Sequence, residues 1–376
     1  MRIGFDAKRA AQNATGLGNY SRFVIRILKN HFPEDEQVLY VPNPKKTQHL
    51  DKVCLATETR FPQGVWKWLR SLWRVWGVTS DLKRDRVDLF HGLSNELPLN
   101  IRKAGGRSVV TIHDLIFLHY PKYYHWIDRK IYDFKFRRAC RNADRVIAVS
   151  EFTKREIMKY YGTPEAKIDV VYQGCDPAFA APVSKEKLDD VALRYSLPRQ
   201  FILYVGSIEE RKNLMLVAKA IASRPSAFSH KIVAVGKRTP YVDEIRKYLK
   251  ANGIADRMLF FHKVPFADLP SFYRLADAFV YPSRIEGFGI PMLEAISSGL
   301  PAIGCTGSCL EEAGGPHCVY VDPDDAQAMS AALCRVVSDK ELRETMIREG
   351  YKYARNFTDE ALAGKVHEVY SSILQA

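Results

Sequence analysis

Short apolar runs alternate with amphipathic stretches along the whole chain. The apolar runs predict strands at 2–6, 37–41, 52–56, 87–91, 108–112, 145–149 and 168–172, and again at 201–205, 231–235, 257–261, 278–281, 301–304 and 318–321. Apolar positions three and four residues apart predict helices at 18–31, 62–77, 126–142, 151–161, 213–223, 240–252, 267–276, 290–298, 324–336, 339–354 and 357–374. Strands that alternate with helices indicate parallel sheets covered on both faces by helices.

The length and one break in this pattern predict two domains. A chain of 376 residues is long for a single core, and the stretch 173–200 lacks an apolar strand. We therefore expect an α/β protein with a first domain at 1–176 and a second at 177–356. The last helix, within 357–376, follows the second sheet and is expected to cross back to the first domain. Two doubly wound, Rossmann-like domains facing an interdomain cleft would bind ligands outside the carboxyl ends of their strands.

The composition is that of a globular protein, with 47% hydrophobic and 26% charged residues. No apolar run approaches ~18 residues, and residues 1–6 alternate as a strand does, so we expect neither a membrane-spanning helix nor a signal peptide but a cytoplasmic protein. Seven cysteines without regular spacing argue against a disulfide framework. The only cluster, Cys305, Cys309 and Cys318, contains no C-x-x-C pair, and we expect no metal site there.

The charge is distributed unevenly. The whole formal net charge of +13 falls in residues 1–175, because the remaining residues contain equal numbers of basic and acidic side chains. This asymmetry suggests that the first domain faces an anionic partner: nucleic acid, an anionic membrane leaflet or a phosphorylated substrate. A solvated basic surface is the alternative.

Two loops after strands could hold phosphate. The first contains Gly16 and Gly18 and leads into a helix, an arrangement that either admits a phosphate or serves as a plain helix-entry turn. The second runs from Gly206 to Arg211 and Lys212, where the next helix begins. Cations at a helix N-terminus are unfavourable because they oppose the helix dipole, so a bound anion such as a diphosphate would explain why Arg211 and Lys212 lie there. The alternative is that both are solvated loop charges without a bound anion.

A third loop, after strand 278–281, contains the most candidate functional groups. Glu286 lies on a Gly-x-Gly turn and Glu294 lies about one turn into the helix that follows. Carboxylates accept sugar hydroxyls well, and the amides of Gly289 and Ile290 at the helix start can donate to hydroxyls or phosphate. A fourth candidate, His113, ends strand 108–112. It either faces the cleft as a near-neutral donor or acceptor or has a structural role.

The segment 283–302, with E-G-F-G-I-P-M-L-E-A, resembles the E-x-seven-E signature of the retaining glycosyltransferases of family four. The loop from Gly206 to Lys212 is similar to that family's diphosphate loop, Gly16 lies in a similar glycine loop, and His113-Asp114 matches its first-domain histidine. The segment 149–154 is also similar to that family's sequence pattern. One departure is Gln173-Gly174-Cys175-Asp176, where Asn-Gly-Val-Asp is common.

The resemblance implies the GT-B fold and a glycosyltransferase that retains the anomeric configuration and uses a nucleotide-sugar donor without a metal or other cofactor. Arg211 and Lys212 would stabilise the departing diphosphate in place of a metal, and Glu294 would hold the ribose. His113 would approach the donor sugar from the first domain. The remaining donor contacts would be Gly16 and Gly206 at the phosphates, the segment around Val264 at the base, and Glu286 with the amides of Phe288, Gly289 and Ile290 at the sugar.

The resemblance favours GDP-mannose as the donor, with UDP-glucose, UDP-galactose and UDP-N-acetylhexosamine as alternatives. The acceptor would be a glycan or lipid-linked glycan in the assembly of a cell-surface polysaccharide such as lipopolysaccharide. A nucleotide-sugar epimerase or a phosphorylase would share the fold. A nucleic-acid-binding protein is a remote alternative, since no nucleic-acid-binding motif is present, and we expect no nucleic-acid partner.

Four of the five tryptophans lie in 66–76. On a helix, Trp66, Trp68, Leu69, Leu72, Trp73, Val75 and Trp76 would fill one half, while Lys67, Arg70, Ser71 and Arg74 would form a narrower polar stripe. Such a helix is typical of peripheral contact with an anionic membrane, here the inner face of the cytoplasmic membrane. The alternative is a helix packed on the first sheet with a solvated basic edge.

Overall fold

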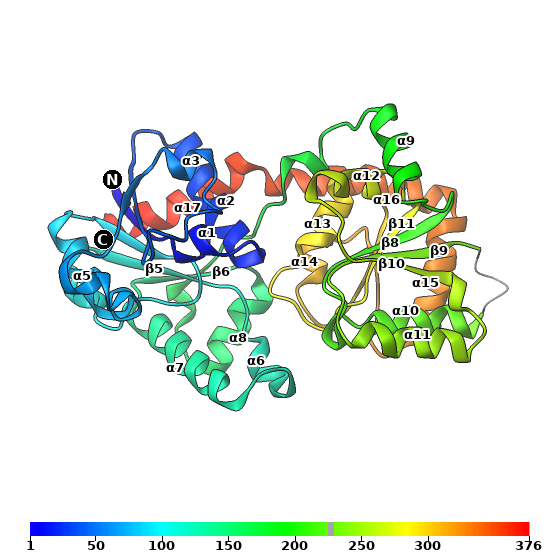
Figure 1. Cartoon of the computed structure of the whole chain (residues 1–376), viewed down its shortest axis with the longest axis horizontal. Coiled ribbons are helices and arrows are strands. Elements are labelled where there is room, and N and C mark those ends of the chain that lie inside the picture. The colour runs from blue at the N-terminus through cyan, green and yellow to red at the C-terminus, as the bar shows by residue number, and fades with distance from the viewer. Residues whose placement is uncertain (225–228, 376) are drawn as a thin grey trace. The chain divides into compact units, whose positions relative to one another are not determined.

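The computed structural model describes residues 1–224 and 229–375 and divides into two compact units (Figure 1). Unit 1 contains Met1–Gly174 together with Phe357–Ala376, and unit 2 contains Cys175–Asn356. The first crossing between the units lies two residues before the boundary expected from the sequence, and the second lies at the expected position.

Unit 1 is built on a seven-stranded parallel sheet. The strands are β1 (Arg2–Asp6), β2 (Glu36–Tyr40), β3 (Glu58–Arg60), β4 (Leu89–Gly92), β5 (Arg107–Ile112), β6 (Arg145–Ala148) and β7 (Ile168–Val170), in the order β3-β2-β1-β4-β5-β6-β7. The order reverses between β1 and β4, which is the switch point of a doubly wound sheet. Its α-helices are α1 (Lys8–Gln12), α2 (Gly16–His31), α3 (Lys52–Leu55), α4 (Arg70–Leu72), α5 (Val78–Arg84), α6 (Ile116–His119), α7 (Trp126–Asn142), α8 (Glu151–Tyr161) and α17 (Asp359–Leu374).

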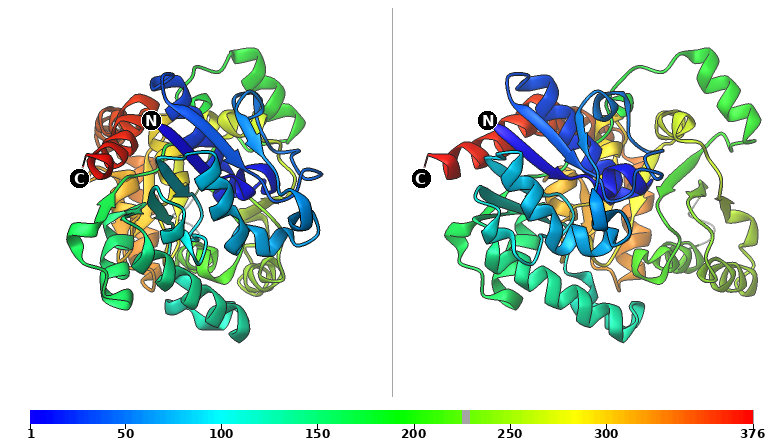
Figure 2. Two further views of the ribbon diagram at one scale, coloured as in Figure 1. Left: turned by 90° about the vertical axis from the view of Figure 1, so that its left-hand side faces the viewer. Right: turned by 60° about the vertical axis from the view of Figure 1, so that its left-hand side comes forward.

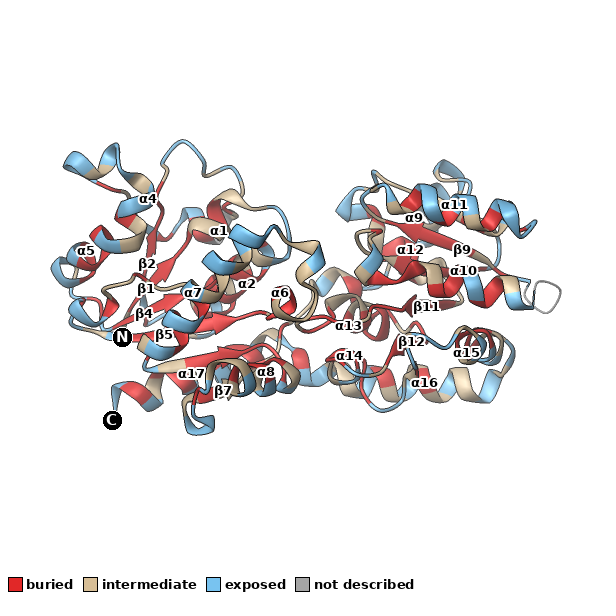
Figure 3. Cartoon of the chain, turned by 90° about the horizontal axis from the view of Figure 1, so that it is seen from below, coloured by how far each residue is buried: buried red, intermediate tan, exposed pale blue. Residues whose placement is uncertain are grey.

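Unit 2 repeats this architecture with six parallel strands in the order β10-β9-β8-β11-β12-β13. The strands are β8 (Phe201–Val205), β9 (Lys231–Val235), β10 (Met258–Phe261), β11 (Ala278–Tyr281), β12 (Ala302–Cys305) and β13 (Val319–Val321). The α-helices are α9 (Lys185–Arg194), α10 (Leu214–Ser223), α11 (Tyr241–Ala251), α12 (Leu269–Leu275), α13 (Ile290–Ser297), α14 (Leu310–Gly314), α15 (Ala326–Ser338) and α16 (Lys340–Ala354). The central strands β8 and β11 are buried, as expected for strands covered on both faces, and Figure 3 shows this burial for β11.

The C-terminal helix α17 packs on α2 within unit 1 (Figure 2). The imidazole of His367 stacks on Phe32 with ring centroids 3.7 Å apart, and the hydroxyl of Tyr370 lies 2.5 Å from Nδ1 of His91, a buried side chain of β4. The last helix is therefore part of the first unit's core.

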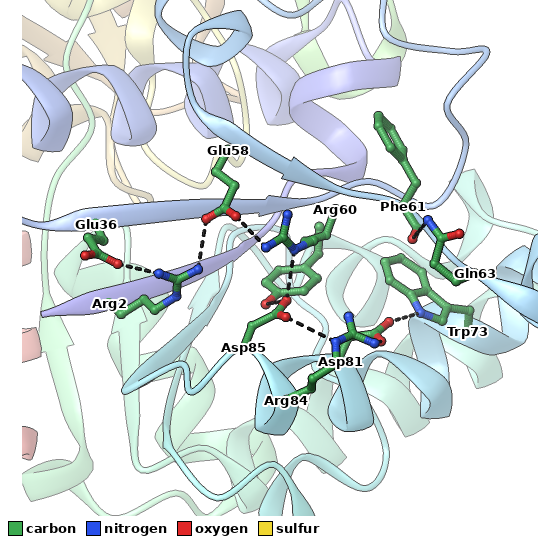
Figure 4. Close-up of polar contacts among 11 residues, drawn as sticks. Arg2, Glu36, Glu58, Arg60, Phe61, Gln63, Trp73, Asp81, Arg84 and Asp85 are labelled. Atoms are coloured by element: carbon green, nitrogen blue, oxygen red, sulfur yellow. Dashed lines mark hydrogen bonds and ion pairs between the residues drawn. The ribbon is translucent and has the colours of Figure 1, made fainter.

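The strand predicted at 52–56 is wrong. Residues Lys52–Leu55 form the short helix α3, and the strand β3 follows at Glu58–Arg60. Oδ1 of Asp51 accepts a hydrogen bond from the amide of Cys54 at 2.8 Å and thereby caps a helical turn. The β3 sequence is polar and gives no hydrophobic signal. Its position at the sheet edge is supported by ion pairs of Glu58 and Arg60 with neighbouring elements (Figure 4).

The single helix predicted over 62–77 is also wrong. The segment contains a 3-10 turn (Gly64–Lys67), the short helix α4 and a five-residue stretch of π-helix (Trp73–Gly77). Leu69 has the non-helical angles φ −100° and ψ 45°, which end the first turn.

Because the helix is interrupted, the tryptophans of this segment differ in burial. Trp73 is 1% exposed, and its Nε1 donates to Asp81 at 2.7 Å (Figure 4), whereas Trp68 is 89% exposed. Arg74, expected on the solvent side, is almost buried and pairs at 2.6 Å with both Asp6 and Glu96. Two carboxylates at the carboxyl edge of the sheet therefore hold this cation inside unit 1.

Candidate active site

The two densest loops of the second half lie at the switch point of the unit 2 sheet. Strands β8 and β11 are parallel neighbours, paired at Ile202 with Ala278 and at Leu203 with Phe279. The loop that carries Arg211 and Lys212 follows β8, and the loop that carries Glu286 follows β11. Parallel neighbours end at the same edge, so the fold brings these loops together where doubly wound sheets bind ligands.

Glu286 is the centre of a buried cluster. Its Oε1 lies 2.5 Å from Nζ of Lys212 and 3.2 Å from a guanidinium nitrogen of Arg211. The hydroxyls of Ser283 and Tyr281 donate to the same oxygen. Glu286 is only 8% exposed and Lys212 only 9%. The sequence predicted these residues at different parts of a ligand, and in the structure the carboxylate is the counter-ion of both cations.

The carboxylate of Glu286 is ionised at neutral pH. Burial alone would raise the pKa of Glu286, but the charges of Lys212 and Arg211, with hydrogen bonds from Lys212 and Ser283, lower it to about 2. Burial lowers the pKa of the Lys212 ammonium, and the Glu286 carboxylate opposes that shift. Two buried opposite charges in contact stay charged because each compensates the desolvation of the other.

The supporting contacts of this cluster were not predicted from the sequence. Arg211 also donates to the carbonyl of Ile285 at 2.6 Å and pairs with Glu209 at 2.8 Å, which fixes its guanidinium beside the turn. The thiol of Cys309 donates to the backbone oxygen of Glu286 at 3.1 Å. Tyr281 belongs to the apolar run of β11 and therefore gives only a core signal in the sequence.

The turn between the two glutamates requires glycine. Gly289 has φ +102°, and a Cβ there would lie 2.7 Å from Cδ2 of Leu310. This residue is the N-cap of α13, and Pro291 occupies the first turn, where a missing amide hydrogen costs nothing. Glu294 follows on α13, so the Gly-x-Gly turn and the proline, which fix the start of this helix, also fix the position of Glu294.

Glu294 has an environment unlike that of Glu286. The hydroxyl of Tyr273, itself 1% exposed, donates to its Oε2 at 2.7 Å. Burial, reinforced by the nearby charge of Asp176 and opposed by the Tyr273 hydrogen bond, raises the pKa of Glu294 to about 7. The two carboxylates lie eight residues apart in the sequence and differ in ionisation: Glu286 is charged at neutral pH, and Glu294 titrates near neutrality.

The raised pKa of Glu294 predicts opposite effects of pH on binding and on stability. An ionised carboxylate accepts hydroxyls better, so affinity for a nucleoside diphosphate should increase as pH rises from 6 to 8. A folded-state pKa above the unfolded value gives stability that is full below about pH 4.5 and is lost as pH rises through about 7. Glu294→Gln should abolish the pH dependence of affinity and, at pH 8, stabilise the fold by about 1–3 kcal/mol.

Titration calorimetry and urea unfolding at both pH values measure the two effects. Equal pH dependence in the wild type and in Glu294→Gln would show that another group titrates.

In unit 1, His113 follows β5 and is 5% exposed. Its Nε2 lies 2.9 Å from the carbonyl oxygen of Leu93, so Nε2 carries the proton, and Nδ1 lies 3.4 Å from the side-chain amide of Gln173. Oδ1 of Asn95 accepts from the backbone amide at 2.7 Å. Burial lowers the pKa of His113 to about 4, so the ring is neutral. The role of His113 at a donor sugar stays a prediction.

The glycine loops are shaped by close backbone contacts. In the first loop, a Cβ at Gly18 would lie 1.8 Å from the carbonyl oxygen of Asn13, whereas one at Gly16, the first residue of α2, meets nothing within 4 Å. Packing thus requires glycine at 18, and a phosphate contact for Gly16 stays a prediction. In unit 2, a Cβ at Gly236 would lie 1.7 Å from the carbonyl oxygen of Gly206, so the loops after β8 and β9 touch.

The remaining predicted donor contacts lie along the same edge of the unit 2 sheet. Val264 follows β10 in a half-buried position, and the preceding His262 donates from Nδ1 to the carbonyl oxygen of Gly236 at 2.9 Å. Phe288 is buried, and Ile290 opens α13. A base contact at Val264 and sugar contacts at Phe288 and Ile290 stay predictions.

Within residues 1–224 and 229–375, no group of three or more His, Cys, Asp or Glu side chains is arranged to hold a metal ion. In the same residues, no helix is long and apolar enough to cross a membrane. A cavity of about 790 Å³ opens at the amino edge of the unit 1 sheet, between Arg86 and Arg107, and none of the predicted site residues line it.

Both units match known families. Residues 21–179 match the family described as Glycosyltransferase Family 4, and residues 189–353 match the one described as Glycosyl transferases group 1. The O-antigen chain mannosyltransferase B of Escherichia coli is 31% identical over 283 residues, which cover 74% of this chain and 72% of that protein. The O-antigen chain mannosyltransferase RfbU of Salmonella typhimurium is 28% identical over 225 residues, covering 60% and 59%. The matched region is only 37% of the serotype-specific mannosyltransferase WbdA of Escherichia coli.

Solved structures agree on the fold. A glycosyltransferase from Rickettsia africae has a TM-score of 0.77 at 17% identity, with 99% of this chain and 98% of that chain covered. Two doubly wound units with this strand order define the GT-B fold class. The chain belongs to the family 4 glycosyltransferases, with a group 1 glycosyl transferase domain in its second unit, and it is a glycosyltransferase.

Proposed function

We propose that this enzyme is a retaining, metal-independent mannosyltransferase that uses GDP-mannose. Its acceptor would be a glycan or lipid-linked glycan in the assembly of a cell-surface polysaccharide. The observation that carries the proposal is the buried cluster of Lys212, Arg211 and Glu286 at the switch point of unit 2. The names of the curated relatives, two of them O-antigen chain mannosyltransferases, support mannose and the polysaccharide acceptor.

Lys212 and Arg211 perform the task that a metal ion would otherwise perform. A glycosyl group leaves a nucleotide as the negative charge on the diphosphate grows, and preorganised cations stabilise that charge. Lys212 supplies a point charge and Arg211 a forked donor, and both are already desolvated and fixed. When a diphosphate binds, the cations shift from Glu286 to the new anion, and the Glu286 carboxylate becomes available to the donor sugar's hydroxyls.

Glu286 is poorly suited to covalent catalysis. After the cations have moved to the diphosphate, its Oε1 still accepts hydrogen bonds from Ser283 and Tyr281, and the carboxylate is engaged with the donor sugar's hydroxyls. Such a group is a weak nucleophile, so we propose that the acceptor attacks the sugar from the face that the diphosphate leaves. The departing diphosphate then takes up the acceptor's proton, and no glycosyl–Glu286 bond forms.

The reaction would take place at the inner face of the cytoplasmic membrane, with segment 62–77 of unit 1 in peripheral contact. Its exposed side chains Trp68 and Trp76, together with Lys67, support this contact. Trp73 and Arg74 are excluded from it because both are held inside unit 1.

A donor panel in the presence of EDTA tests the proposed function. GDP-mannose, UDP-glucose, UDP-galactose and UDP-N-acetylglucosamine are compared by slow donor hydrolysis and by protection against thermal unfolding. We expect GDP-mannose to be hydrolysed fastest, with EDTA having no effect and α-mannose as the first product by NMR. Preference for a UDP sugar would overturn the mannosyl assignment, and loss of activity in EDTA would overturn metal independence.

A further inference from the structure

The long helix α7 of unit 1 has four large apolar side chains that are largely exposed. Trp126 is 65% exposed, Ile127 45%, Ile131 43% and Phe134 55%. At about 100° per residue, all four fall within an arc of about 140°. The opposite side carries Phe136, Ala139 and Cys140, which are buried in the core of unit 1. The helix therefore has two apolar faces, and only one of them is buried within residues 1–224 and 229–375.

Basic side chains share this outer arc. Lys130, Arg137, Arg138 and Arg141 are exposed and lie within the same 140°, whereas the exposed acid of the helix, Asp128, lies outside it. Arg137 pairs with Asp133 at 3.3 Å, and Arg138 donates to the carbonyl oxygen of Leu99 at 3.0 Å. Lys130 and Arg141 make no side-chain hydrogen bond or ion pair with any of the described residues. Aromatic and aliphatic side chains interspersed with unpaired cations are the composition that binds an anionic lipid surface.

Helix α7 lies close to the tryptophan segment, residues 62–77. Glu96 pairs with Arg74 of that segment at 2.6 Å and with Lys135 of α7 at 3.2 Å. Val75 and Phe134 line one small cavity together with Leu97 and Leu99. Both elements therefore lie against residues 96–99 of unit 1 and can present their exposed side chains together.

We propose that the outer arc of α7 (Trp126, Ile127, Lys130, Ile131, Phe134, Arg137, Arg138 and Arg141) is a docking surface for an anionic lipid bilayer. It works beside the tryptophan segment, so segment 62–77 supplies only part of the contact. The indole and phenyl rings enter the headgroup region, and the cations remain at the phosphates. The inference does not depend on the donor or on the sugar that is transferred.

The charge excess of the chain supports lipid rather than a second protein copy. The formal net charge of +13 falls in residues 1–175, and the donor cluster of unit 2 does not use it. Two copies placed arc against arc would bring the cations of both helices together, which is unfavourable. A bilayer that contains phosphatidylglycerol offers both an apolar layer and a negative surface.

The experiment is flotation of the full chain with vesicles of 30% phosphatidylglycerol and 70% phosphatidylcholine, against vesicles of pure phosphatidylcholine. The aromatic variant is Trp126→Ser/Phe134→Ser, and the charge variant is Lys130→Gln/Arg141→Gln. Leu193→Ser is the matched control, because Leu193 of α9 in unit 2 is 82% exposed and lies outside the surface. Trp68→Ser/Trp76→Ser measures the tryptophan segment separately.

We expect the wild type and Leu193→Ser to bind the anionic vesicles and to be released by 0.5 M salt. The charge variant should bind about 30-fold more weakly, since each cation contributes about fivefold, and the aromatic variant should bind at least tenfold more weakly. Nucleoside-diphosphate affinity, measured in parallel, should not change, so a failure of the docking surface is separable from a failure of the proposed function.

Undiminished vesicle binding by both α7 variants would overturn the proposal, as would a wild type that does not bind anionic vesicles. A wild-type dimer in analytical ultracentrifugation that becomes a monomer in the aromatic variant would also overturn it, because the occupant would then be a second copy of the chain.

Discussion

Lys212→Met should lower turnover by about 10²–10³ while the protein stays folded. A charge-assisted contact that strengthens as the diphosphate departs contributes roughly 2.7–4 kcal/mol to the transition state. Lys212 is 9% exposed and its Nζ lies 2.5 Å from Glu286, so a methionine fills much of the space of the stem but carries no charge. Arg211→Ala should lose activity to a similar extent, because the guanidinium faces the same carboxylate at 3.2 Å.

Steady-state donor hydrolysis with thermal unfolding as a folding check measures this effect. Lys219→Met is the matched control, because Lys219 is an exposed lysine on α10, the helix that follows the same loop. Near-normal turnover in both Lys212→Met and Arg211→Ala would rule out a role of these cations in leaving-group departure.

Trp73→Ala should destabilise unit 1 by about 3–5 kcal/mol, whereas Trp68→Ala should change stability by less than about 0.5 kcal/mol. Trp73 is 1% exposed, packs beside Tyr40 and donates to Asp81, so its removal leaves a cavity and one lost hydrogen bond (Figure 4). Trp68 is 89% exposed and has little packing to lose.

Urea unfolding of the two variants measures the difference, with Trp73→Phe as an intermediate case that keeps a ring but not the indole nitrogen. Equal stability losses at Trp68 and Trp73 would contradict the burial of these side chains. The variants at Trp68 and Trp73 also distinguish a buried from an exposed tryptophan within one segment. This distinction is needed before any tryptophan of 62–77 is used in a membrane experiment.

Periodicity predicted the long elements well, because each has an apolar face that packs against a core. The predicted helices 126–142 and 151–161 coincide with α7 and α8, and the strands 201–205 and 231–235 coincide with β8 and β9. Short elements fixed by single polar contacts escaped prediction. The hydrogen bond from the Cys54 amide to Asp51 stabilises a helical turn at 52–55, and the backbone angles of Leu69 interrupt the helix predicted over 62–77.

The residues of the candidate site could be named from the sequence, but the contacts among them could not. Arg211, Lys212, Glu286 and Glu294 stand out in the sequence because charged side chains follow buried strands. The ion pair of Glu286 with Lys212 depends on the pairing of β8 with β11, which the sequence around either residue does not encode. Likewise, Tyr281 and Tyr273 look like core residues, and only their hydroxyls, directed at Glu286 and Glu294, reveal a polar role.

The central claim is that Glu286 holds, in the free enzyme, the two cations that serve the diphosphate of the donor. Calorimetric titration of the wild type and of Glu286→Gln with GDP and with UDP, in EDTA, tests it most directly. Glutamine keeps the size and the hydrogen-bond acceptor but removes the competing charge, so the variant should bind the preferred diphosphate about tenfold more tightly while donor hydrolysis falls. Weaker diphosphate binding by Glu286→Gln would contradict the account, because Glu286 would then support the diphosphate site rather than occupy its cations.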